Sequence, residues 1–128
     1  GTMARLMDRL AGGVAAFYED VQARIDGINV VVMSEFGRRA KENAALGTDH
    51  GHGNMMMVLG GGICGGRVYA DWPGLGTEQL VGSGDLAVIT DYRDVLGEVI
   101  RKRLNNPLVE EVFPAYQVSE VGLAEEKN

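Results

Sequence analysis

The sequence is poor in residue types on which several classes of protein depend. It contains one cysteine, Cys64, in 128 residues, so no disulfide can form within the chain and the fold does not depend on oxidation. Lysine and arginine number 12 against 18 aspartates and glutamates, which gives a net charge of −6. This balance argues against a nucleic-acid-binding surface, because phosphate contacts need clustered cations.

Long apolar runs are also lacking. No run approaches the ~20 residues that a membrane-spanning helix needs, so no membrane span is expected. Arg5, Asp8 and Arg9 interrupt the first apolar residues, and no secretory signal is recognisable. The localisation is therefore unknown from this chain. Gly1 and Thr2 look like a remnant of an expression vector.

The remaining composition is typical of a folded domain. Apolar residues make up 45% and charged residues 23% of the chain, which are ordinary values for a soluble globular protein. The length predicts a single domain over residues 1–128. Nineteen glycines, concentrated between Gly47 and Gly84, predict a loop-rich middle region. Residues 119–128 are polar and predict a frayed tail.

Periodic apolar residues predict two helices. In the first, six side chains share one face that should be buried: Leu6, Leu10, Val14, Phe17, Val21 and Ile25. Asp26-Gly27 should end this helix. The second helix should be capped by Thr90 or Asp91 and end at residues 105–107, with residues 101–103 as its cationic end. Residues 109–113 predict one further helical turn.

Two apolar runs predict the centre of a sheet. Residues 28–33 are rich in valine and offer no wet face, which is typical of a strand covered on both sides. Residues 54–59 form a second run that ends at three glycines, and residues 85–90 predict a further short strand. The stretch 34–48 is too polar and too rich in glycine for another core element. These patterns predict an α/β fold, with a mostly parallel sheet flanked by helices.

Metal-ligand residue types gather beside the two apolar runs. The only histidines, His50 and His52, stand next to Asp49, and Glu35 follows the first run. Imidazole and carboxylate groups suit Zn²⁺, Mn²⁺ or Fe, so these four residues are candidate ligands of a divalent metal. The alternative is that they brace a glycine-rich loop through hydrogen bonds and hold no metal.

Two arginines and one serine in the same region could contact a substrate. Arg38 and Arg39 are candidates to hold an anionic ester through bidentate hydrogen bonds, and the alternative is a solvated pair in a loop. Ser34 lacks the surrounding G-x-S-x-G of a nucleophile elbow, so it reads better as a hydrogen-bonding cap at the strand end.

An ordered series of motifs resembles one protein family. The series is VVVMSEFGR, GTDHGHGN, a glycine-rich GGG..GG, a Trp-Pro-Gly-Leu turn and TDYRDVL. It resembles the C-terminal part of the domain of unknown function 1501 family, over nearly the whole chain to about Pro114. By the same resemblance the family lies in the alkaline phosphatase and sulfatase superfamily. This implies a metal-dependent, hydrolase-like α/β fold, of which the chain would be the C-terminal portion.

The resemblance also implies roles for particular residues. In the superfamily a strand runs into Ser-Asp-His-Gly, whose Asp and His bind metal; here Glu35 takes the place of the Asp, but Phe36 cannot replace the His. The later Asp49-His50 resembles a downstream metal-binding motif, which makes His50 the first candidate ligand, ahead of Asp49 and His52. Family members are usually several times longer and exported, with the nucleophile in an N-terminal half that this chain does not contain.

Two functions are therefore expected as alternatives. The first is a sulfatase- or phosphatase-like domain that is catalytically incomplete alone and keeps part of a divalent-metal site. The second is a non-enzymatic structural or interaction module without metal. A third, an enzyme assembled from two chains, needs a partner that the sequence does not name. A homo-oligomer is expected, because a sheet cut from a larger one exposes a strand edge and an apolar helix face.

Overall fold

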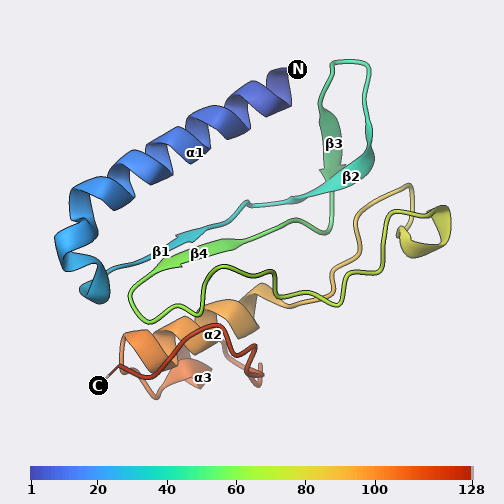
Figure 1. Cartoon of the computed structure of the whole chain (residues 1–128). Coiled ribbons are helices and arrows are strands. Elements are labelled where there is room, and N and C mark those ends of the chain that lie inside the picture. Colours follow the sequence, from blue (N-terminus) through green and yellow to red (C-terminus); the bar gives the residue numbers. More distant parts are fainter. Residues whose placement is uncertain (128) are drawn as a thin grey trace. The chain divides into compact units, whose positions relative to one another are not determined.

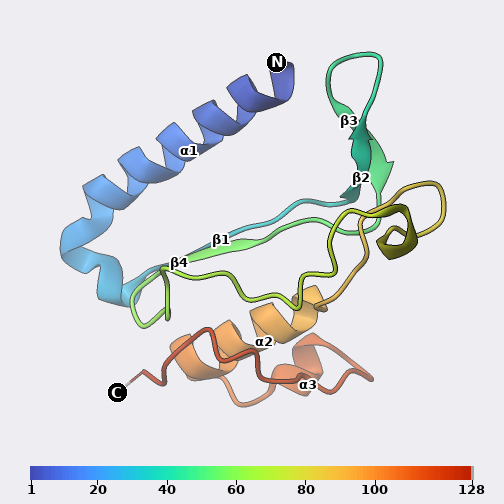
Figure 2. The same cartoon turned by 45° about the vertical axis from the view of Figure 1, so that its right-hand side comes forward.

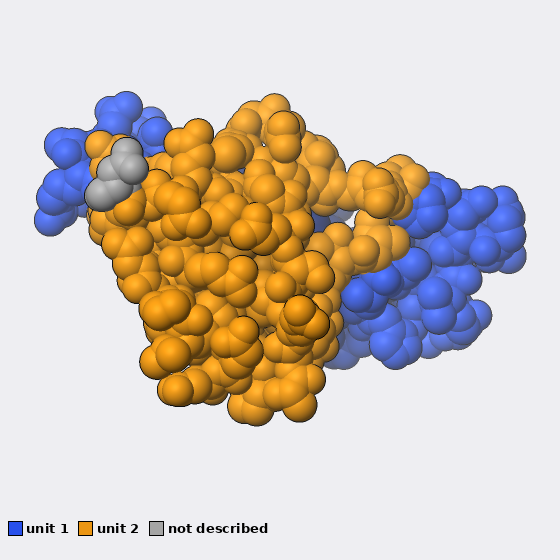
Figure 3. Space-filling model, turned by 90° about the horizontal axis from the view of Figure 1, so that it is seen from below, with its two compact units in different colours: residues 1–25, 33–55, 73–88 blue, residues 26–32, 56–72, 89–128 orange. Residues whose placement is uncertain are grey.

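The chain divides into two compact units, each built from three separate segments. The computed structural model describes residues 1–127. Unit 1 comprises residues 1–25, 33–55 and 73–88, and unit 2 comprises residues 26–32, 56–72 and the residues from 89 onward (Figure 3). The prediction of a single domain stays a prediction.

Unit 2 contains the two apolar runs, paired as antiparallel strands. They are β1 (Asn29–Val32) and β4 (Met57–Gly60), which lie side by side in Figure 1 and Figure 2. Val30 pairs with Leu59 in this two-stranded sheet. Both strands are rich in apolar residues, so the pairing places apolar side chains of one strand beside apolar side chains of the other.

Unit 1 contains a second two-stranded antiparallel sheet, made of β2 (Gly37–Glu42) and β3 (Thr48–Gly51). The predicted mostly parallel sheet flanked by helices is therefore wrong. Parallel strands need a long crossover connection, usually a helix. Between β1 and β4 the chain forms the β2–β3 hairpin instead, in the stretch that the sequence suggested was loop. The predicted strand over residues 85–90 is reduced to isolated bridges of Asp85 with Arg39 and Val81.

The first predicted helix is present but its apolar face is not covered. It forms α1 (Thr2–Val21), followed by the 3-10 helix η1 (Gln22–Gly27). Val21 is the one buried residue of α1, whereas Leu6 is 51% and Phe17 45% exposed. The expectation that this face is buried is wrong. Among the described helices, none has the length and apolar content needed to cross a membrane.

The second helix is confirmed as α2 (Tyr92–Arg103). The side chain of Asp91 caps it by accepting a hydrogen bond from the backbone N–H of Arg93 at 2.9 Å. Arg101, Lys102 and Arg103 stand in the last turn, where they compensate the helix dipole. The further turn is α3 (Val109–Val112), and a short 3-10 helix, η2 (Thr77–Gln79), lies in unit 1.

The C-terminal segment, which was expected to be frayed, contributes to the core of unit 2. Val99 of α2 packs with Leu123 and Ala124, all of them buried. The backbone N–H of Cys64 donates to the carbonyl of Leu123 at 2.8 Å, and Ile63 forms a β-bridge with Ala124. The prediction of a frayed tail from residue 119 is therefore wrong for residues 121–127.

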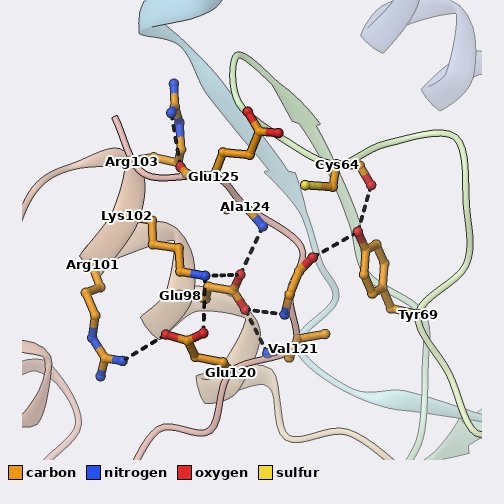
Figure 4. Close-up of polar contacts among 11 residues, drawn as sticks. Cys64, Tyr69, Glu98, Arg101, Lys102, Arg103, Glu120, Val121, Ala124 and Glu125 are labelled. Carbon is orange, nitrogen blue, oxygen red and sulfur yellow. Dashed lines mark hydrogen bonds and ion pairs between the residues drawn. The ribbon is translucent and has the colours of Figure 1, made fainter. Parts of the chain in front are cut away.

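A buried carboxylate holds this segment to α2 (Figure 4). Glu98 is fully buried, and its Oε2 accepts hydrogen bonds from the backbone N–H groups of Val121 at 2.7 Å and Gly122 at 2.8 Å. Its Oε1 accepts from the backbone N–H of Ala124 at 3.0 Å and from Nζ of Lys102 at 3.1 Å. Burial raises the pKa of Glu98, but these donors together outweigh it and hold the pKa below its ordinary value.

Candidate functional site

The β2–β3 hairpin of unit 1 carries most of the candidate ligands. Asp49 and His50 lie on β3, and His52 follows the end of that strand. Arg38 on β2 pairs with His50 across the hairpin, and all three candidate ligands are exposed. The hairpin therefore presents two histidines and a carboxylate to solvent.

The glycines between and after the histidines are required by close backbone packing. A Cβ at Gly51 would lie 2.8 Å from the carbonyl carbon of Arg38, and a Cβ at Gly53 would lie 2.7 Å from the carbonyl oxygen of Ala87. The backbone N–H of Gly53 donates to the carbonyl of Leu86 at 3.0 Å, and the backbone N–H of Leu86 donates to the carbonyl of Arg38 at 3.2 Å. The two glycines of the D-H-G-H-G pattern thus have a steric cause, and the same packing brings residue 85 to the hairpin.

His52 and Asp85 form the shortest polar side-chain contact of this region. Nδ1 of His52 lies 2.6 Å from Oδ2 of Asp85, whose side chain is only 10% exposed while that of His52 is 74% exposed. A carboxylate can only accept, so the hydrogen between the two atoms belongs on Nδ1. In the neutral imidazole this leaves the lone pair on Nε2, directed away from Asp85.

Arg39 joins this pair to Asp49. Its Nε lies 3.3 Å from Oδ1 of Asp85, and its Nη1 lies 3.7 Å from Oδ2 of Asp49. Asp49 also accepts a hydrogen bond from Nδ2 of Asn43 at 2.9 Å. The guanidinium of Arg39 therefore balances two carboxylates of the protein itself, which reduces what it can offer to an anionic ligand.

His50 and Arg38 instead surround Phe36. The rings of His50 and Phe36 are stacked, with centroids 3.7 Å apart and an interplanar angle of 27°. The guanidinium carbon of Arg38 lies 5.0 Å from the Phe36 centroid, and Nη1 of Arg38 donates to the carbonyl of Thr48 at 2.8 Å. Phe36 therefore serves as the packing surface for one histidine and one arginine.

The candidate ligands do not form a complete metal centre in this chain. Within residues 1–127, no three histidine, cysteine, aspartate or glutamate side chains converge on one point. Glu35 and Ser34 are exposed ahead of β2. The donor set fits one oriented imidazole ligand, His52, and does not fit a closed metal site. Metal binding by His50, Asp49, His52 and Glu35 stays a prediction.

Asp85 was missed by the sequence analysis. It is 33 residues from its partner His52, and no spacing rule links the two. The available signal was local, since Asp85 follows Gly84 and precedes a short apolar run. That signal marks a polar residue at the start of an extended segment, but it does not say which histidine the carboxylate reaches.

Comparison with known proteins identifies a family for this chain. A family model described as "Protein of unknown function (DUF1501)" matches residues 1–103, a stretch that includes the β2–β3 hairpin, Asp85 and α2. No curated protein and no solved structure gives a significant match. Because the match covers well over half of the 128 residues, the chain belongs to the DUF1501 family.

Proposed function

We propose that this chain carries part of a divalent-metal site that binds anionic esters of the phosphate or sulfate type, and that it is catalytically incomplete alone. The observation that carries the proposal is the 2.6 Å contact between Nδ1 of His52 and the nearly buried carboxylate of Asp85. Metal-binding histidines characteristically donate their other ring N–H to a carboxylate, which fixes the ring and makes the ligating nitrogen more basic.

The geometry favours His52 over His50 as the first ligand. His50 is stacked on Phe36, and no carboxylate orients it in the described chain, whereas Asp85 fixes the ring of His52. Asp49, with its side chain 55% exposed, offers a carboxylate oxygen on the same hairpin. Zn²⁺, Mn²⁺ and Fe all accept such a nitrogen and oxygen set.

The chain's own residues have defined tasks in this proposal. Asp85 keeps the hydrogen of His52 on Nδ1, and Arg39 balances the charges of Asp85 and Asp49. Arg38 donates one N–H to the carbonyl of Thr48. Its guanidinium has further N–H donors, which suit the oxygens of an ester. A bound metal would supply Lewis-acid polarisation of that ester.

The resemblance to the alkaline phosphatase and sulfatase superfamily supports the hydrolase class. Two observations support the proposal that the catalytic site is incomplete in this chain alone. Phe36 stands where the superfamily pattern has a metal-binding histidine. The remaining candidates do not converge within residues 1–127. The enzyme that the resemblance implies would therefore need ligands and a nucleophile from outside the stretch that the structure describes.

A non-enzymatic module is the second candidate. It is favoured by the mutual pairing of Arg39 with Asp49 and Asp85, which leaves these charges balanced without a metal. The steric need for Gly51 and Gly53 also accounts for two of the five residues of the D-H-G-H-G motif without any ligand. In this alternative the cluster only fixes the hairpin to the segment around Asp85.

Titration calorimetry with Zn²⁺ and Mn²⁺ separates the two candidates. His52→Ala should lower the affinity at least tenfold, and Asp85→Asn about 10- to 100-fold, because the imidazole loses its orienting partner. His50→Ala is the matched control and should have the smaller effect. Equal binding by the wild type and His52→Ala, with both folded by circular dichroism, would leave the non-enzymatic module. A tenfold loss in His50→Ala alone would make His50 the first ligand.

A further inference from the structure

The last part of unit 2, residues 117–127, forms a strap that is held by residues far earlier in the chain. The backbone N–H of Cys64 donates to the carbonyl of Leu123 at 2.8 Å, and Glu98 accepts from the backbone N–H groups of residues 121, 122 and 124 (Figure 4). Among residues 1–127, the hydrogen bonds of the strap lead to residues 62–103, and none joins two strap residues. The strap is therefore bound in the way that a separate peptide would be.

The surface under the strap is costly to leave empty. Leu123 is 4% and Ala124 5% exposed, and both pack against Val99 of α2. Departure of the strap would expose these apolar side chains to water and remove three backbone donors from Glu98. The strap should therefore leave its place only where an equivalent segment takes it over. A second copy of the same chain supplies that segment.

The turn that leads into the strap is strained. The backbone N–H of Tyr116 donates to the carbonyl of Phe113 at 3.2 Å, which closes a turn over residues 113–116. Ala115, inside this turn, has a φ of 59°. A residue with a Cβ is disfavoured at such a φ, where glycine is the usual residue. Opening the turn into an extended hinge would relieve this strain, and short strained hinges favour exchange of a segment between copies.

We propose that the strap exchanges between two copies of the chain, with residues 113–116 as the hinge. Each strap then lies on unit 2 of the other copy and makes the same contacts there, so both surfaces stay covered. Because those contacts are unchanged, the opened hinge provides the difference that favours the dimer over two closed monomers. The exchange is reciprocal, so it closes at two chains.

A disulfide across the strap contact reports the exchange directly. Ile63 and Ala124 form a β-bridge, and the separation of bridged residues suits a disulfide. In a Cys64→Ala background, chains with Ile63→Cys alone are mixed with chains with Ala124→Cys alone and oxidised mildly. Exchange should give a 63–124 disulfide between two chains, found by peptide mapping in a product of twice 13.7 kDa.

The same two cysteines placed in one chain are the positive control. At low protein concentration they should form the disulfide within the monomer, which shows that the contact and the fold are intact. Closure of this control, together with no 63–124 disulfide in the concentrated mixture of single variants, would overturn the exchange.

Variants of the hinge test its cause by light scattering on the full chain. Ala115→Gly relieves the positive φ in the closed monomer, so the dimer dissociation constant should rise about tenfold. Leu46→Gly is the matched control, because Leu46 has a φ of 58° but lies between β2 and β3 in unit 1, and it should leave the constant unchanged. A wild type that stays monomeric over a concentration series, or equal effects of the two variants, would contradict the proposal.

Discussion

Oε1 of Glu98 accepts a hydrogen bond from the backbone N–H of Ala124 at 3.0 Å, across 26 residues of sequence. Three backbone donors and the ammonium of Lys102 converge on this one fully buried carboxylate. The pairing satisfies a charge that would otherwise be costly to bury. It also fixes the segment that supplies Leu123 and Ala124 to the core of unit 2.

Removing the Glu98 carboxylate should destabilise unit 2 strongly. Glu98→Ala leaves the N–H groups of Val121, Gly122 and Ala124 without their acceptor, and it leaves Lys102 with the exposed Glu120 alone, for a loss of about 3 kcal/mol or more in the free energy of unfolding. Urea unfolding measures the loss. Glu120→Gln is the control, because Glu120 also contacts Lys102 but its side chain is 57% exposed, so it should cost less than about 1 kcal/mol. Equal losses in both variants would show that Glu98 holds nothing beyond a surface ion pair.

The same carboxylate predicts sensitivity to acid. The pKa of Glu98 in the fold lies below the ordinary 4.5, because its hydrogen-bond donors outweigh burial. The unfolded chain therefore binds the proton more readily, so this stability is present above pH 4.5 and is lost as the pH falls through the folded pKa. Amide exchange measured from about pH 6 down to about pH 3 should show protection of Val121, Gly122 and Ala124 falling over this range, once corrected for intrinsic rates. Protection that is independent of pH would contradict this role.

The cap of α2 offers a two-variant test. Asp91→Ala removes the acceptor for the N–H of Arg93 and should cost about 1 kcal/mol. Asp91→Asn keeps a capping oxygen and loses only the ion pair with the Arg93 side chain, so its cost should be less than half of this. Thermal unfolding of both variants gives the comparison. Equal losses would assign the effect to the ion pair rather than to the cap.

Two glycines should respond to alanine in opposite directions. At Gly53 a Cβ would lie 2.7 Å from the carbonyl oxygen of Ala87, so Gly53→Ala should destabilise the chain by about 1–3 kcal/mol. At Gly12, within α1, a Cβ would meet no atom within 4 Å, so Gly12→Ala should stabilise the helix by about 0.5–1 kcal/mol. Chemical denaturation measures both changes. A neutral Gly53→Ala would show that the packing around the hairpin can relax.

The helices were predictable from the sequence because their signals are local. The cap at Asp91 and the cations in the last turn of α2 define that helix within a dozen residues. The apolar period of α1 is equally clear, but a period shows which face is apolar and not whether this chain covers it. The exposed Leu6 and Phe17 show the difference.

Strand direction and the site partners were not predictable in the same way. The apolar runs at β1 and β4 read equally well as neighbours in a parallel or an antiparallel sheet, and the connection between them decides. The contact between His52 and Asp85 depends on the packing of residues 84–86 against β2, which no short motif encodes. The sequence therefore identified His52 as a candidate ligand from its local motif, but it did not identify Asp85, the carboxylate that contacts it.

The family match ends at Arg103, whereas unit 2 continues beyond that residue. Leu123 and Ala124 complete the core around Val99, and the partners of Glu98 lie between residues 121 and 124. An expression clone trimmed to the matched stretch would expose that core and remove the three backbone donors of Glu98, leaving Lys102 as its one remaining partner among those described. Family limits drawn from sequence similarity thus mark the stretch that these proteins share, whereas the packed core of unit 2 extends about twenty residues further.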